Sequence, residues 1–182
     1  MRILGIDPGT ATTGYGIIES PPFPSSPGAR LAEDGESRRE GRMPGGQERS
    51  LRALAYGCIR TPVKAPLEKR LSEIYDDLNK LIKKYKPNLV AVESLFFFKN
   101  ITTAISVSHA RGVVLLAAHE HKLKVVEFTP LQVKNSLTGF GRAEKKQVQY
   151  MVRTLLNLKS VPKPDDAADA LAIALCGAGS KL

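Results

Sequence analysis

Alternating and continuous runs of apolar residues predict three strands in the first third of the chain. They lie over residues 2–7, 13–19 and about 52–61. A Pro-Gly-Thr turn at residues 8–10 separates the first two. Residues 20–50 are rich in Pro, Gly, Ser and mixed charge and contain few apolar residues, so we expect a flexible hairpin-loop insertion there.

The rest of the chain shows the periodicity of helices that alternate with short buried strands. Residues 66–84 carry one apolar stripe at helical spacing. The further elements predicted are a strand at 89–93, a helix at about 101–121, a strand at 124–128, and helices at 129–137, 143–158 and 165–176. This order indicates an α/β protein with helices on the faces of one sheet, and 182 residues suit a single domain, 1–182.

The charge balance favours a polyanionic partner. Lys and Arg number 27 against 18 Asp and Glu, a net charge of +9. Such a surface suits nucleic acid, although good solubility alone is an alternative. The two cysteines, Cys58 and Cys176, lack metal-ligand spacing and are interpreted as buried free thiols. No apolar stretch is long enough to span a membrane and no signal peptide is apparent, so we expect a cytoplasmic protein.

Carboxylates occupy positions where the predicted elements end or begin. Asp7 and Glu93 each follow a buried strand, where an uncompensated charge is costly. Asp166 and Asp169, three residues apart, share one face of the last helix. Asp165 and Asp169 are four apart and also share a face, so spacing alone does not choose between Asp165 and Asp166.

Carboxylates that lie close together repel one another and recruit cations. Two Mg²⁺ ions would balance four such charges, and ligands that are all oxygen favour Mg²⁺ or Mn²⁺ over Zn²⁺. Paired ions of this kind usually serve phosphate chemistry. The alternative is structural, since Asp7 suits a turn and Asp165 or Asp166 suits a helix cap. That alternative is weaker for Glu93, which precedes three phenylalanines.

The chain resembles the RuvC family of Holliday junction resolvases, which have the ribonuclease H-like fold. The resemblance covers most of the chain outside residues 20–50. It is carried by the order and spacing of several segments: ILGIDPGT (3–10), TGYG (13–16), GCIRT (57–61), VE (92–93) with Phe96 and KN (99–100), ARG (110–112), QVK (132–134), AEK (143–145) and DAADALAI (166–173).

The resemblance implies a ribonuclease H-like mixed five-stranded sheet with helices on both faces. Asp7, Glu93, Asp166 and Asp169 match the family's catalytic, metal-binding acids, and the pattern DAAD favours Asp166 over Asp165. The implied enzyme is a homodimeric endonuclease of recombination and repair, using two Mg²⁺ or Mn²⁺ ions per site. It would nick two strands of like polarity symmetrically in a four-way DNA junction, leaving 5′-phosphate and 3′-hydroxyl ends.

The resemblance also implies contacts to DNA. An aromatic at the position of Phe96 contacts bases near the cut, with Phe97 as helper, whereas Phe98 is interpreted as packing on the next helix. Lys134 and Lys145 match lysines that approach phosphates. The further helpers expected are Lys99, Arg142 and Lys146.

Helix 101–121 has an apolar face that the family uses for dimerisation, with Gly112 allowing close approach of backbones, although a core role would look the same from the sequence. A branch-migration helicase complex is the further partner implied. Three rival classes are an actin-like ATPase, suggested by IDPGT at residues 6–10, a ribonuclease H-like nuclease of ribosomal RNA precursors, and a non-catalytic DNA-binding module. The short chain disfavours the actin-like ATPase. The other matched segments disfavour the nuclease of ribosomal RNA precursors, and the four intact acids disfavour the non-catalytic module.

Overall fold

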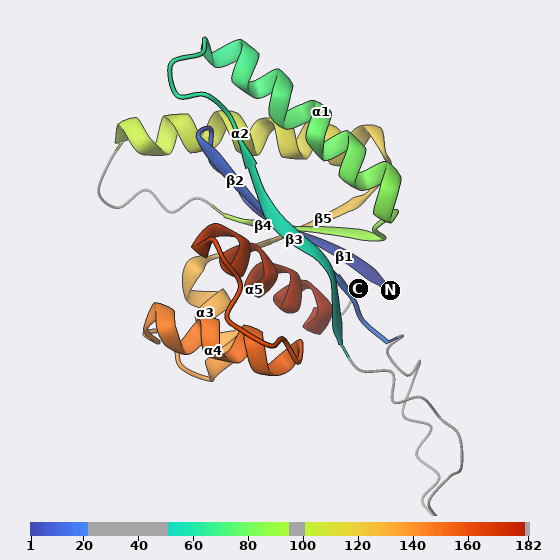
Figure 1. Cartoon of the computed structure of the whole chain (residues 1–182), viewed down its shortest axis with the longest axis vertical. Helices are drawn as coiled ribbons and strands as arrows, with labels where there is room; N and C mark the ends of the chain where they lie inside the picture. The colour runs from blue at the N-terminus through green and yellow to red at the C-terminus, as the bar shows by residue number, and fades with distance from the viewer. Residues whose placement is uncertain (22–50, 95–100, 181–182) are drawn as a thin grey trace, which may run out of the picture.

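The computed structural model describes residues 1–21, 51–94 and 101–180, and the side chains of residues 101–103 lie outside that description. Five strands form one sheet in the order β3-β2-β1-β4-β5 (Figure 1). The elements are β1 (Arg2–Asp7), β2 (Thr12–Glu19), β3 (Arg52–Arg60), α1 (Leu67–Tyr85), β4 (Leu89–Glu93), α2 (Ile101–Glu120), β5 (Lys124–Phe128), α3 (Pro130–Thr138), α4 (Lys145–Leu155) and α5 (Asp165–Gly179).

The sheet is mixed, as predicted. Strands β1, β2 and β3 form an antiparallel meander, whereas β1, β4 and β5 run parallel to one another. Parallel neighbours need a crossover, and helices α1 and α2 supply the two crossovers here. The carboxyl ends of β1 and β4 therefore meet at one edge of the sheet, which is where Asp7 and Glu93 lie.

Helices cover both faces of the sheet (Figure 1). Successive residues of a strand point to opposite faces of its sheet. Ile3 and Leu89 pack in a core with α3, α4 and α5. Leu4 and Val90 pack in a second core with α1 and α2. Because β1 and β4 are buried on both faces, they read as continuous apolar runs rather than as alternating ones.

Helix α5 lies unusually close to the sheet. A Cβ atom on Gly5 of β1 would lie 2.2 Å from the carbonyl oxygen of Ala170. That distance is far inside van der Waals contact, so only glycine fits there. The approach draws the N-terminal turn of α5 toward the carboxyl end of β1.

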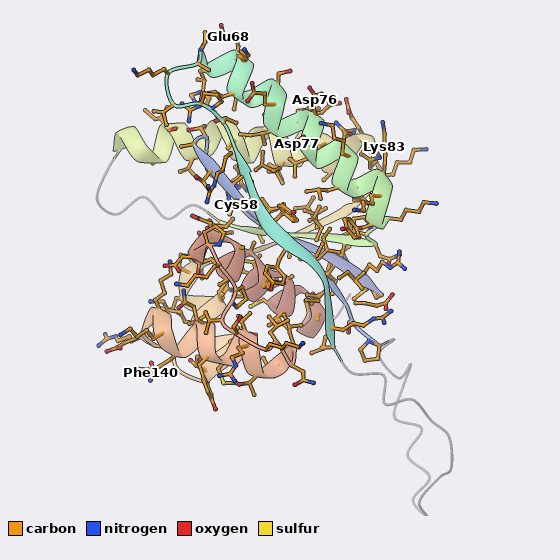
Figure 2. All side chains as sticks on the ribbon, in the orientation of Figure 1. Cys58, Glu68, Asp76, Asp77, Lys83 and Phe140 are labelled. Carbon is orange, nitrogen blue, oxygen red and sulfur yellow. The ribbon has the colours of Figure 1, made fainter. Side chains whose placement is uncertain are left out.

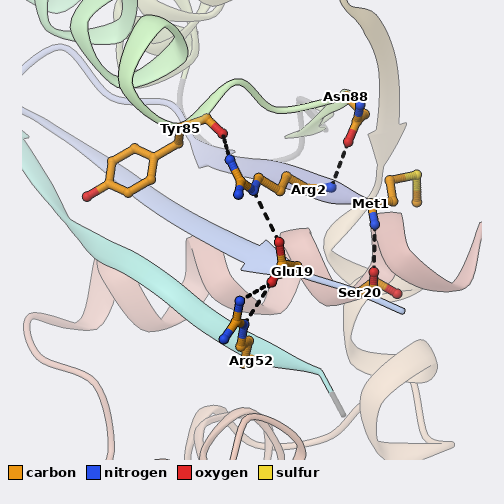
Figure 3. A network of polar contacts seen from close by, with 7 residues as sticks. All are labelled: Met1, Arg2, Glu19, Ser20, Arg52, Tyr85 and Asn88. Carbon is orange, nitrogen blue, oxygen red and sulfur yellow. Dashed lines mark hydrogen bonds and ion pairs between the residues drawn. The ribbon is translucent and has the colours of Figure 1, made fainter. Parts of the chain in front are cut away.

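Polar contacts fix the opposite end of the meander (Figure 3). Glu19 accepts hydrogen bonds from Arg2 Nε at 3.2 Å and from Arg52 Nε at 2.8 Å. The Arg2 guanidinium also donates to the carbonyl of Tyr85 at 2.9 Å, and the Arg2 backbone N–H donates to Asn88 Oδ1 at 2.8 Å. These contacts join all three antiparallel strands to the end of α1, so they hold the register on which the position of Asp7 depends.

The predicted elements agree with the observed ones in kind and order and differ at several of their ends. Helix α4 begins at Lys145 rather than at 143, because Glu144 is its N-cap and forms a capping box with Gln147. Helix α5 extends to Gly179, beyond the predicted end at 176. The predicted insertion falls almost wholly on residues outside the described ranges. Across the described ranges, no helix combines the length and apolarity needed to cross a membrane.

Candidate active site

Asp7 and Glu93 end two adjacent parallel strands. The register pairs Ile6 with Val92, so the next residue on each strand is an acid. Neighbouring strands lie about 4.8 Å apart. The two carboxyl groups therefore emerge side by side at the same edge of the sheet.

Asp166 reaches the same edge from α5. Gly14 is the register partner of Asp7, and a Cβ atom on Gly14 would lie 2.1 Å from the carbonyl oxygen of Asp166. The first turn of α5 therefore rests on the backbone beside Asp7, and Asp169 follows on the next turn. The N-cap of α5 is Pro164 and makes no side-chain hydrogen bond, so neither Asp165 nor Asp166 acts as the cap.

The electrostatics of Asp7 show that the four acids converge. Burial, followed by repulsion from Glu93, Asp169 and Asp166, raises the pKa of Asp7 to about 7. Burial, followed by the charge of Asp169, raises the pKa of Glu93. Burial also raises the pKa of Asp169 despite an opposing hydrogen bond from Lys145. Such a group of partly buried, mutually repelling carboxylates is unfavourable without a cation.

Lys145 is the cation that this chain supplies. Its Nζ lies 3.1 Å from Asp169 Oδ2 and 3.3 Å from Asp165 Oδ2. Burial lowers the pKa of Lys145, but the contacts with Asp169 and Asp165 outweigh that effect and raise it. Asp165 also pairs with Lys163 at 3.7 Å. Asp165 thus contacts the lysines beside the acids, a role that the spacing of acids in the sequence does not indicate.

The donors fit a hard divalent ion. Asp7, Glu93, Asp166 and Asp169 offer only oxygen ligands, and the raised pKa of Asp7 means that a bound cation would relieve strong repulsion. In the part of the chain that the structure describes, however, no three Asp, Glu, His or Cys side chains are already arranged to hold one ion in common. Lys145, paired with Asp169, neutralises part of the charge in this arrangement.

Hydroxyl groups behind the site anchor the turn that follows Asp7. Thr10 Oγ1 lies 2.6 Å from Ser106 Oγ of α2. Thr61 Oγ1 donates to the carbonyl of Thr10 at 2.6 Å. Thr10 and Thr61 are buried, so their hydrogen bonds are well protected from water. Thr10 and Thr61 fall in two of the segments that carry the family resemblance, but the sequence did not indicate that their hydroxyl groups anchor the turn.

Cys58 lies on β3, where the charge of Asp166 acts on its thiol. It pairs with Gly14 across β2 and β3, and it is only partly buried, contrary to expectation. Burial, followed by the negative charge of Asp166, raises the pKa of its thiol. Cys176 is buried as expected.

The residues expected to contact DNA divide into three groups. Lys145 lies at the acids. Lys134 lies on α3, Arg142 is exposed just before α4, and Lys146 is exposed on its first turn; across the described ranges, none of the three forms an ion pair with the four acids. Phe96, Phe97, Phe98 and Lys99 lie outside the described residues.

Comparisons with known proteins agree on one family. The family model described as crossover junction endodeoxyribonuclease RuvC matches residues 44–177. A protein of that name from Desulforamulus reducens is 48% identical over 178 residues, 98% of this chain and 93% of that protein. The protein of that name from Heliobacterium modesticaldum is 49% identical over 180 residues, 99% of this chain and 95% of that one.

Among solved structures, the RuvC of Thermus thermophilus in complex with a Holliday junction substrate has a TM-score of 0.77 and 33% sequence identity to this chain. The alignment covers 97% of this chain and 92% of that one. The likeness extends over the sheet and the helices that carry the four acids.

Proposed function

This chain belongs to the RuvC family of crossover junction endodeoxyribonucleases, and we propose that it resolves four-way DNA junctions by paired, symmetric nicks in strands of like polarity. The expected α/β fold, with a mixed sheet covered on both faces, is confirmed. The observation that supports the activity most directly is the meeting of four acids from three elements. Burial, followed by repulsion from the other three acids, raises the pKa of Asp7 to about 7.

We propose that Asp7, Glu93, Asp166 and Asp169 hold two Mg²⁺ ions, or Mn²⁺ in their place. Bound metal would supply an activated water and neutralise charge on the departing 3′ oxygen, leaving 5′-phosphate and 3′-hydroxyl ends. Asp7 would hold the ions together with Glu93 and Asp166, because it lies between Glu93 on β4 and Asp166 over β2. Lys145 pairs with Asp169 in this structure. When DNA binds, Lys145 would contact a phosphate in place of Asp169.

We further propose a homodimer formed through α2. Its exposed face carries Ile105 and Leu116, which are 53% and 52% exposed, with His109 and Gly112 between them at helical spacing. A Cβ atom on Gly112 would meet nothing within 4 Å, so the chain itself does not require glycine there. A second copy that packs closely against α2 would require it. Leu116→Glu should give monomers by light scattering, whereas Val63→Glu, at another exposed apolar site, should not.

The remaining expectations complete the proposal. One nuclease domain over residues 1–182 is supported by the single sheet, against which α1, α2, α3 and α5 pack, while α4 packs on α3 and α5. We place the enzyme in the cytoplasm, where its junction substrate and a branch-migration helicase complex would be its partners. The basic balance of the chain, +9, suits the DNA.

The test measures nicking and binding separately. Asp7→Asn, Glu93→Gln, Asp166→Asn and Asp169→Asn should each lose nicking of a synthetic four-way junction in Mg²⁺ while still binding it in EDTA. Asp165→Asn is the matched control and should keep nicking within about tenfold, because its ion pairs with Lys145 and Lys163 are half-exposed to solvent and such pairs are weak. Full nicking by Asp7→Asn would refute the assignment. Equal cleavage of linear duplex or RNA would refute the junction specificity.

A further inference from the structure

A groove opens between α3 and α4. Its volume is about 440 Å³, within the range of sites that hold small ligands. Its lining is largely apolar and comprises Leu137, Thr138, Phe140, Ala143, Lys146, Gln147, Tyr150 and Met151. Phe140 and Tyr150 are 60% and 59% exposed, so two aromatic rings face water here. Phe140 lies at the outer side of the α3 and α4 layer (Figure 2).

The turn that carries Phe140 is well ordered by its own hydrogen bonds. Gly139 ends α3 with a φ of 73°. Thr138 Oγ1 accepts from the Phe140 N–H at 3.2 Å, and the Phe140 carbonyl accepts from the Ala143 N–H at 3.0 Å. The turn therefore holds an aromatic ring in water, where it contributes little to the core. A preorganised exposed ring of this kind suits the stacking of a ligand.

The charges around the groove favour an anionic ligand. Lys146 is one of the lining residues, and none of the eight lining residues is acidic. The preceding residue, Lys145, reaches Asp169, so the groove and the acids share the first turn of α4. That turn is also the positive end of the helix. A ligand that combines an apolar ring with a phosphate matches both the aromatic residues and the lysine.

We propose that this groove binds an unstacked nucleotide of the DNA strand that leads to the active site. The base stacks on Phe140 and Tyr150, and its phosphate pairs with Lys146. The proposal rests on the proposed nuclease function and adds a binding site to it. An apolar partner protein would need no cation at the groove, so Lys146 in its lining favours DNA over that occupant.

The experiment compares Phe140→Ala, Tyr150→Ala and Lys146→Ala with Val63→Ala, a control whose side chain is 74% exposed elsewhere. Binding to a four-way junction and to a single-stranded oligonucleotide is measured in EDTA over a series of salt concentrations. Loss of stacking on one base, about 1–3 kcal/mol, corresponds to about 5- to 150-fold weaker binding for each aromatic variant, with an unchanged salt slope. Lys146→Ala should instead reduce the salt slope by about one.

Two further variants separate stacking from folding. Phe140→Trp should bind like the wild type, and Phe140→Leu should bind like Phe140→Ala, while both unfold at the wild-type temperature. The proposal is overturned if Phe140→Ala binds both DNA substrates as tightly as the wild type and Val63→Ala do. It is also overturned if Phe140→Ala keeps its DNA affinity and loses binding to a protein partner instead. A wild-type protein that neither binds nor nicks junctions would instead overturn the nuclease function itself.

Discussion

Asp7→Asn should stabilise the metal-free protein, and more strongly at pH 8 than at pH 5. The pKa of Asp7 rises from 3.8 to about 7 on folding, so the folded state holds its proton more tightly than the unfolded state. Stability is therefore lost as the pH rises from the unfolded value through about 7, and it levels off above that. Asn cannot ionise, so the variant is free of this loss.

The magnitude follows from the shift. One pKa unit is about 1.4 kcal/mol, and a shift of this size changes the free energy of unfolding by about 2.6 kcal/mol between pH 5 and pH 8. Asp7 is partly buried and keeps some contact with water, so we expect about half of that, roughly 1.3 kcal/mol. The extra stability of Asp7→Asn at pH 8 over pH 5 should have this size.

Urea unfolding is followed by circular dichroism in EDTA at fixed protein concentration. It measures the free energies of unfolding of the wild type and of Asp7→Asn at pH 5 and at pH 8. Asp77→Asn on α1 is the control, because the Asp77 side chain is 45% exposed and, among the described residues, its ion pair is with Lys80. Its effect should stay within about 0.5 kcal/mol at either pH. An equal effect of Asp7→Asn at both pH values, or a larger gain at pH 5, would refute the reasoning.

Three other outcomes follow from the same geometry. Lys145→Met should destabilise the metal-free protein at pH 8 by up to about 1 kcal/mol, because it removes the positive charge that pairs with Asp169. The sign is opposite to that of Asp7→Asn, and a stabilised Lys145→Met variant would contradict the reasoning. Mg²⁺ at ten times its dissociation constant should stabilise the wild type by about 1.4 kcal/mol in thermal unfolding and Asp7→Asn by much less; equal gains would argue against Asp7 as a ligand. Gly14→Ala should cost about 1–3 kcal/mol in urea unfolding and lower nicking, since its Cβ meets the Asp166 carbonyl at 2.1 Å, whereas Gly179→Ala, with open space around it, should change neither.

Much of the fold was predictable because its signals are local. The runs before Asp7 and Glu93 are apolar at every position, which is typical of strands buried on both faces. The stripe in α1 repeats at helical spacing. Helix ends were less predictable. The start of α4 depends on the capping box of Glu144 and Gln147, whose hydrogen bonds form only once the chain turns there.

The site was predictable only in part, because some of its contacts join residues that lie far apart in the sequence. That acids end two strands and begin a helix is visible in the chain, and motif order assigned them to one family. Cys58, by contrast, lies beside Asp166 because β2 places Gly14 between β1 and β3, a matter of register across three strands. The contacts of Asp165 with Lys145 and Lys163 likewise join residues from separate segments.

The sequence by itself determined the strands, the helices, the family and the identity of the four acids, because periodicity and motifs depend on neighbours along the chain. Only the tertiary structure decided how closely those acids approach. That approach depends on α5 lying on the bare backbone of Gly5 and Gly14. It sets the burial and, after burial, the repulsion that raise the pKa of Asp7. Coulombic energy varies with distance through space, which a linear sequence does not contain.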